Sequence, residues 1–192
     1  MTITSKIQNK IIKQGRGWVF TPRDFLNIRH FNTINPLLDR IENRGLIRSL
    51  GGGLYDYPII DPDTGLPRNP KIEIVIKAVE KQLNDKFQFS GAYACVLLGL
   101  TKQMPAELKY LSNKQNRVVY AAGFKIKIAQ TIIPTPRNKY DKGTLAIQAI
   151  KHIGKTKLTL GQLKHIKKQL NEAELKKLKK LANNVSWIKR IV

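Results

Sequence analysis

The sequence predicts an α+β protein in two parts, and three observations support this. The first 60 residues alternate helical apolar stripes with short aromatic or β-branched segments, residues 61–70 hold three prolines and a glycine, and the remainder mixes helical and strand patterns. A stretch with the composition of 61–70 sustains neither a helix nor a central strand. We therefore expect a domain at 1–60, a linker at 61–70 and a second α+β domain at 71–192.

The first predicted helix begins in the segment Ser5–Gln8. Its residues Ser-Lys-Ile-Gln have the form of a capping box, in which the serine hydroxyl accepts from a backbone amide and the glutamine side chain reaches back. An apolar stripe of Ile7, Ile11 and Ile12 follows and ends at Gly15.

A short strand and a second helix come next. Trp18-Val19-Phe20 is aromatic and β-branched, which is typical of a strand. Thr21 follows as an N-cap, and Pro22 fits the first helical position because its missing N–H has no partner there. The second helix is therefore expected to begin at Pro22.

The third predicted helix has a clear apolar period. Asn32 and Thr33 compete as its N-cap, Gly45 closes it, and Pro36 is tolerated if it lies in the first turn. The aliphatic residues at i, i+3, i+4 and i+7 are Ile34, Leu37, Leu38 and Ile41.

A hairpin completes the first part. Leu46–Leu50 and Leu54–Tyr57 are strand-like, and Gly51–Gly53 form the turn between them. A phosphate-binding nucleotide loop is the alternative for these glycines, but the Gly-Lys-Ser/Thr ending and a following helix are missing. The order helix, strand, helix, helix, hairpin is that of a winged helix-turn-helix.

The outward face of the third helix is polar and suits DNA. Asn pairs with adenine and Arg with guanine through two hydrogen bonds each. We expect base contacts from Thr33, Asn35 and Arg40. We expect phosphate and sugar contacts from Asn43, Arg44, Arg48, Gly51, Gly52 and Gly53. Arg16 is also expected to bind DNA. A solvated face that mediates protein contacts is the alternative.

Charge favours polyanions as partners. The chain of 192 residues has 35 Lys and Arg against 13 Asp and Glu, a formal net charge of +22. Residues 151–192 alone hold 12 basic and 2 acidic side chains, a net of +10. Such a field attracts nucleic acid or an anionic membrane at long range. Without a membrane-spanning run or a signal-peptide pattern, we expect a cytoplasmic protein with no membrane partner.

The second part mixes helices and strands. A helix capped by Asn69-Pro70 carries an apolar face of Ile72, Val75, Ile76, Val79 and Leu83. The remaining expected elements are a strand at 87–89, a helix capped by Ser90, strands at 107–111, 117–121 and 124–129 in a small antiparallel sheet, and helices from Gly143 onward, one of them capped by Asn171.

Catalytic and metal motifs are missing from the sequence. Cys95, the only cysteine, lies in an apolar run without a nearby base and is expected to be core. The Asp61-Pro62-Asp63 segment is better explained as a turn than as a metal site. The lysines from Lys176 to Lys180 form either a solvated face or a binding surface. We expect no enzyme activity, no metal and no cofactor.

Several segments of the sequence resemble a known family. The chain is similar to the AbiEi-like antitoxins of bacterial type IV toxin–antitoxin loci, above all to their short members, in Gly15–Phe25, Leu38–Arg48, Gly53–Pro58, Ser90–Ala92, Leu98–Leu100, Met104–Ala106 and onward to Trp187.

The resemblance implies a winged helix that binds operator double-stranded DNA and represses its own operon. It also implies an antitoxin domain that counteracts a nucleotidyltransferase-type toxin encoded nearby. The second domain is much shorter than in the longer members, so no antitoxin residues are carried over. The alternative function is a winged-helix module that binds nucleic acid or protein without a cognate toxin.

Overall fold

The computed structural model describes residues 2–192 and divides the chain into two compact units. The first unit runs to Asp85 and also contains Val119–Lys125, and the second contains Lys86–Val118 and Ile126–Val192. Helices and two small sheets occur together, so the predicted α+β class is confirmed. The predicted linker at 61–70 lies inside the first unit, and a domain boundary there stays a prediction.

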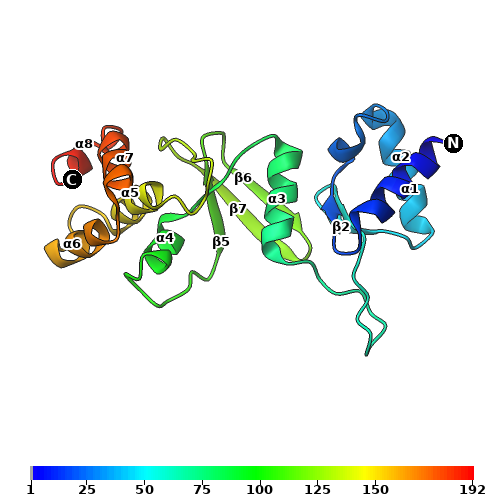
Figure 1. Cartoon of the computed structure of the whole chain (residues 1–192), viewed down its shortest axis with the longest axis horizontal. Coiled ribbons are helices and arrows are strands. Elements are labelled where there is room, and N and C mark those ends of the chain that lie inside the picture. Colours follow the sequence, from blue (N-terminus) through cyan, green and yellow to red (C-terminus); the bar gives the residue numbers. More distant parts are fainter. Residues whose placement is uncertain (1) are drawn as a thin grey trace. The chain divides into compact units, whose positions relative to one another are not determined.

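The first unit has the element order that the sequence predicts. Its elements are α1 (Ile3–Gln14), β1 (Val19–Phe20), the 3₁₀ helix η1 (Pro22–Phe25), α2 (Phe31–Asn43), β2 (Arg48–Gly51), β3 (Leu54–Asp56) and α3 (Ile72–Leu83), as labelled in Figure 1. The three strands form an antiparallel sheet in the order β1-β3-β2. The helix-turn-helix is therefore η1 and α2, and the wing is the β2–β3 hairpin.

The start of α1 differs from the prediction. Thr2 is the N-cap and accepts from the backbone N–H of Ser5 at 3.1 Å, so the expected capping box at Ser5 is wrong. The apolar face of the helix contains Ile7 and Ile11, which are four residues apart and fully buried, whereas Ile12 is 53% exposed.

The N-cap of α2 also differs from the prediction. The N-cap is His30, so Asn32 and Thr33 both lie within the first helical turn. Pro36 consequently lies beyond that turn, where its ring removes the hydrogen bond that an amide would donate to the carbonyl of Asn32. The predicted start of η1 is confirmed, since the Thr21 N–H donates to Asp24 Oδ2 at 2.9 Å.

The core of the first unit fixes the orientation of α2. Ile34, Leu38 and Ile41 have no exposed surface, and Leu37 is half-buried. They pack in one apolar cluster that also contains Phe20 and other buried residues of α1 and η1. Each such aliphatic side chain contributes roughly 1.5–3 kcal/mol when fully buried. The opposite face of α2 is thereby directed to solvent.

The second unit joins a sheet to a group of helices. Its elements are β4 (Gln88–Phe89), α4 (Gly91–Leu97), β5 (Leu108–Ser112), β6 (Arg117–Ala121), β7 (Phe124–Gln130), α5 (Lys142–Ile153), α6 (Leu160–Lys168), α7 (Glu172–Ala182) and α8 (Ser186–Lys189). The tip of the β6–β7 hairpin belongs to the first unit.

The sheet order in this part of the chain is β4-β5-β7-β6. β5 pairs with β7 in parallel, so the sheet is mixed and not antiparallel as predicted. The reason is topological, because the chain passes from β5 to β6 at the far edge and returns with β7 between them.

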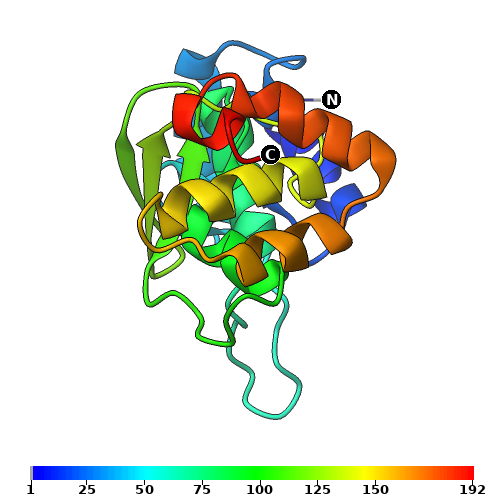
Figure 2. The same cartoon turned by 90° about the vertical axis from the view of Figure 1, so that its left-hand side faces the viewer.

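Helix α5 is the centre of the second unit. It packs against α4 and α7, and Figure 2 shows it in yellow with α7 alongside. Gly91 allows the close approach of α4, because a Cβ there would lie 2.3 Å from the Cβ of His152. Cys95 is 5% exposed, and burial raises the pKa of its thiol, which confirms it as a core residue.

The helices of residues 2–192 are all too short or too polar to cross a lipid bilayer.

Candidate nucleic-acid interface

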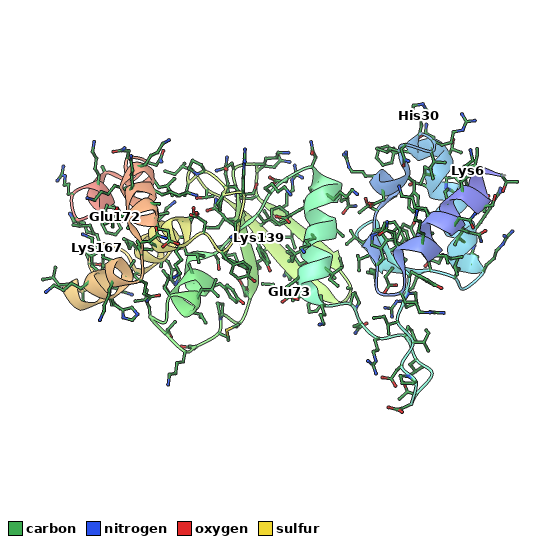
Figure 3. All side chains as sticks on the ribbon, in the orientation of Figure 1. Lys6, His30, Glu73, Lys139, Lys167 and Glu172 are labelled. Atoms are coloured by element: carbon green, nitrogen blue, oxygen red, sulfur yellow. The ribbon has the colours of Figure 1, made fainter. Side chains whose placement is uncertain are left out.

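The polar face of α2 is open to solvent as the sequence predicts. Its exposed residues are Asn32, Thr33, Asn35, Pro36, Asp39, Arg40, Asn43 and, just beyond the helix, Arg44. We call this set the reading face. None of its side chains is covered by the packing that buries Ile34, Leu38 and Ile41. Figure 3 labels His30, which immediately precedes the helix.

The acidic groups of α2 are engaged by the wing. The hydroxyl of Tyr55 on β3 donates to Asp39 Oδ1 at 3.1 Å, and the backbone N–H of Ser49 donates to Glu42 Oε1 at 2.9 Å. Partial burial, together with the bond to Asp39, raises the pKa of Tyr55 to about 12. Both carboxylates therefore tie the helix to the hairpin, and the repulsion that they would exert on phosphate is partly offset.

The donor groups of the reading face have no such partners. Within residues 2–192 no hydrogen bond or ion pair engages the side chains of Thr33, Asn35, Arg40, Asn43 or Arg44. With the exposed Asn32 included, this surface therefore presents two guanidinium groups, three amides and a hydroxyl to an external ligand. These groups match the hydrogen-bonding pattern of base edges and phosphates.

Arg48 is committed to a partner inside the protein. Its Nη2 donates to Asp56 Oδ2 at 2.8 Å and its Nε donates to Oδ1 at 3.2 Å, while Nη2 also reaches the carbonyl of Arg68 at 3.0 Å. Arg48 and Asp56 are paired across β2 and β3, and the side chain of Asp56 is only 2% exposed. The pair braces the wing, so Arg48 is a weak candidate for phosphate.

Arg16 also makes contacts within the first unit. Its Nη1 donates to the carbonyl of Pro58 at 2.8 Å, and its guanidinium lies 4.7 Å from the ring centroid of Tyr57. These contacts fix the end of β3 where the chain leaves the sheet. A DNA contact from Arg16 stays a prediction.

The glycine wing is contacted by other parts of the first unit. Gly52 has a φ of +60°, and a Cβ there would lie 2.9 Å from the carbonyl oxygen of Tyr120. The side chain of Gln82 donates to the carbonyl of Gly52, and the Ala122 N–H donates to the carbonyl of Leu50 at 2.6 Å. Gly51, Gly52 and Gly53 remain exposed. Their expected phosphate contact is untested, and the hairpin tip at 119–122 limits their freedom.

Sequence reasoning missed the basic residues that precede α2. Arg23 in η1 lies 5.7 Å from the ring centroid of Phe31, and Arg29 and His30 are exposed in the turn before the helix. In a helix-turn-helix this region contacts the DNA backbone, so the guanidinium groups of Arg23 and Arg29 are candidate phosphate contacts. The signal that could have found them is the basic character of the turn itself.

The Asp61-Pro62-Asp63 segment, for which a metal site was the alternative, forms a turn. Asp61 Oδ1 accepts from the N–H groups of Asp63 at 3.0 Å and Thr64 at 3.2 Å, which confirms a turn. The hydrogen bond from Arg68 and those backbone bonds hold the pKa of Asp61 below its usual value. No group of three or more His, Cys, Asp or Glu side chains suited to a metal occurs within 2–192.

The lysines of α7 differ in whether they have a partner within the protein. Lys177 is not part of the free face, because its Nζ pairs with Asp141 Oδ2 at 2.8 Å, whereas Lys176, Lys179 and Lys180 are exposed. Although burial alone would raise the pKa of Asp141, the bonds from Lys177 and Thr144 hold it below the usual value.

Comparison with known proteins gives a family match that covers most of the chain. The model described as "Family of unknown function (DUF6088)" matches residues 6–178. A search of the curated proteins finds no match.

Proposed function

We propose that this chain, which belongs to the DUF6088 family of unknown function, is a sequence-specific repressor that binds double-stranded DNA. In this proposal the protein recognises its operator with α2. The observation that carries the proposal is the division of polar groups on this helix. The acids, Asp39 and Glu42, are bonded to the wing, while the reading-face donors are unengaged.

The unengaged donors suit the major groove. An α-helix fits that groove, and its N-terminal part faces the bases. Asn35 lies in the second turn of α2 and Arg40 further along, both exposed. A bidentate pair between such a side chain and a base discriminates by about 1–3 kcal/mol. Asn43 and Arg44, at the end of the helix, are assigned to phosphate and sugar.

The net charge of +22 supplies the nonspecific part of binding. Each neutralised phosphate lowers the slope of log K against log salt by about 0.9. Arg23, Arg29 and Arg44 are exposed guanidinium groups that lie outside α2, before and after it in the sequence. We assign them to the DNA backbone.

The finer proposal is that this repressor is the antitoxin of a type IV toxin–antitoxin pair in the cytoplasm. It rests on the similarity of Gly15–Phe25, Leu38–Arg48 and the later phrases to AbiEi-like antitoxins. A nucleotidyltransferase-type toxin would be counteracted by the second unit.

A specific observation favours an alternative without an operator. The wing tip is contacted by Gln82 and by the 119–122 segment, and a winged helix whose wing is occupied can act as a protein-interaction or RNA-binding module. This candidate predicts binding without preference for a duplex sequence.

The experiment is selection of bound duplexes from a random pool, followed by gel-shift titration of single variants. Arg40→Ala should lower affinity for the selected site and relax preference at one base pair, by about 1–3 kcal/mol. Arg44→Ala should weaken all duplexes alike and reduce the salt slope by about one unit. Lys179→Ala, which removes an exposed lysine of the second unit, is the matched control and should change neither.

Two results contradict the proposal. One is unchanged binding after Arg40→Ala and Arg44→Ala are combined, which would mean that α2 does not meet DNA. The other is competition by structured RNA at the same concentration as the selected duplex, which would favour the alternative module.

A further inference from the structure

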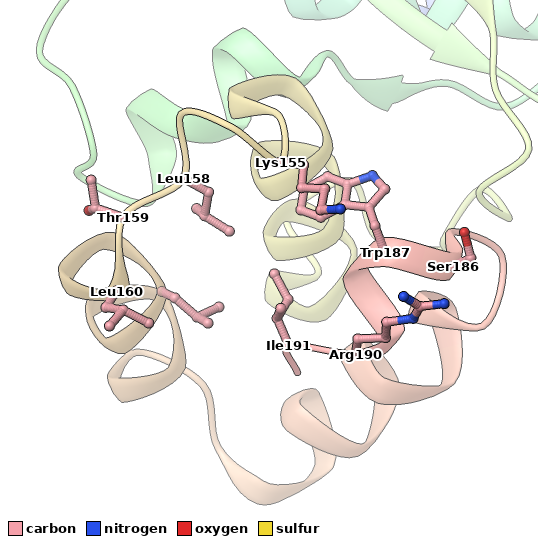
Figure 4. Close-up of a pocket in the computed structure, with 9 residues that line it drawn as sticks. Lys155, Leu158, Thr159, Leu160, Ser186, Trp187, Arg190 and Ile191 are labelled. Atoms are coloured by element: carbon pink, nitrogen blue, oxygen red, sulfur yellow. The ribbon is translucent and has the colours of Figure 1, made fainter.

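The second unit has a groove that operator binding does not use. It lies between α6, α8 and the segment that leads into α6, and its volume is about 580 Å³. Figure 4 shows Leu158, Leu160 and Ile191 around the open space, with Trp187 and Arg190 on the α8 side.

Aliphatic and aromatic side chains line much of the groove, although it opens to water. The side chain of Leu160 is 79% exposed, Ile191 is 36% exposed, and Trp187 is half-buried. Leu163, which is 8% exposed, also lines the groove. A cluster of exposed aliphatic and aromatic side chains with a polar rim is a feature of interaction sites, and Trp is among the residues that contribute most to binding.

The charged residues around the groove favour an occupant with negative charge. Among residues 2–192, those that line the groove include two cations, Lys155 and Arg190, and no acidic side chain. The surrounding segment 151–192 holds 12 basic and 2 acidic side chains. One of the two acids, Glu174, is turned back to the Asn171 N–H at 3.0 Å in the capping box that the sequence predicts for α7.

A second copy of this chain is a poor occupant, because it carries the same +22 charge and would be repelled. A nucleic acid supplies negative charge but few aliphatic groups to fill a leucine-lined groove. A peptide helix with leucines on one face and glutamates beside them supplies both, in the helix-in-groove mode of recognition.

We infer that the groove between α6 and α8 is the docking site for an acidic, amphipathic segment of a partner protein. The apolar side chains of that segment lie against Leu160, Trp187 and Ile191, and its carboxylates lie near Lys155 and Arg190. This interaction is separate from DNA reading by α2, so each can fail without the other.

The test uses the full chain and a synthetic helical peptide with leucines at i, i+4 and i+7 and glutamates at the flanking positions. The chain has two tryptophans, so a ¹H–¹⁵N spectrum shows two indole signals, which Trp18→Phe assigns. The peptide should move the Trp187 signal and leave that of Trp18 in place. The dissociation constant comes from the same titration.

Two pairs of variants separate docking from general charge attraction. Leu160→Ser should weaken peptide binding about tenfold, about 1.4 kcal/mol. Leu66→Ser, at a similarly exposed leucine outside the groove, should not. Lys155→Gln with Arg190→Gln should also weaken it about tenfold, whereas Lys179→Gln with Lys180→Gln, which removes the same charge from α7, should change it less than twofold.

Three outcomes would overturn the inference. The first is equal binding of a peptide with serine in place of leucine, since the attraction would then be charge alone. The second is a stationary Trp187 signal at saturation. The third is that a short nonspecific DNA duplex displaces the peptide and shifts the Trp187 indole signal in the same way. That result would assign the groove to nucleic acid.

Discussion

Substitution of Arg48 by methionine distinguishes two roles of this residue, as an ion-pair partner that stabilises the wing and as a contact to DNA phosphate. The sequence places Arg48 on the DNA backbone, whereas the structure pairs it with Asp56 through two hydrogen bonds. Methionine keeps much of the aliphatic length but removes the charge and every donor. Asp56, with a side chain 2% exposed, would then be left without its cation.

The expected cost follows from the exposure of the two partners. Removing one partner of a fully buried pair costs about 3–5 kcal/mol, and an exposed pair contributes about 0–1 kcal/mol. Arg48 keeps 29% of its side-chain surface exposed, so the pair lies between these limits. We expect Arg48→Met to lower the free energy of unfolding by about 2–3 kcal/mol. Asp56→Asn in the same chain should recover part of that loss, because the uncompensated charge is gone.

Urea unfolding followed by Trp18 fluorescence, with Trp187→Phe in every variant, measures this cost. Trp18 reports on the correct unit because its ring stacks on Phe20 at 4.5 Å. Under conditions where the variant stays folded, the salt slope of DNA binding should match that of the parent. A cost below about 1 kcal/mol, or a slope reduced by about one unit, would show that Arg48 leaves Asp56 to meet phosphate.

Two further predictions concern the wing and the tyrosine beside it. Gly52→Ala should destabilise the protein by about 1–3 kcal/mol, because the residue has a left-handed φ and an added Cβ would meet the carbonyl oxygen of Tyr120. Gly45→Ala is the control and should cost less, because Gly45 is also left-handed but a Cβ there would meet nothing within 4 Å. Equal losses of unfolding free energy for the two variants in urea melts would refute the contact. Stability should fall as pH rises from 10.0 to about 12, since the folded state holds the Tyr55 proton after the unfolded state has lost it. Tyr55→Phe should remove that fall and Tyr120→Phe, at a 62% exposed ring, should not, as pH-dependent melts would show.

Local periodicity accounts for the pattern of buried and exposed residues on α2, which the structure confirms. Burial of Ile34, Leu38 and Ile41 follows from their i, i+4, i+7 spacing, and the exposure of Asn35 and Arg40 follows from the same helical geometry. These features depend only on residues within one helix, so a single sequence contains the information.

Long-range pairing accounts for what was missed. The partner of Arg48 depends on the register of β2 and β3, which shifts between Ser49 and Gly51. The parallel pairing of β5 with β7 depends on a choice of strand order that alternation along each strand does not encode. The contacts of Gly52 with Tyr120 and Gln82 join residues 68 and 30 positions apart, which no local pattern reveals.

The tip of the β6–β7 hairpin has a consequence for dissecting this protein. Val119–Lys125 belongs to the unit formed by the chain up to Asp85, so that unit is assembled from two stretches of polypeptide. A fragment cut after Asp85 would carry η1 and α2 but would lose the strand loop that supports the glycine turn. Modules exchanged between family members should therefore take this loop with the N-terminal portion, since the gene cannot be divided at one point without separating neighbours in space.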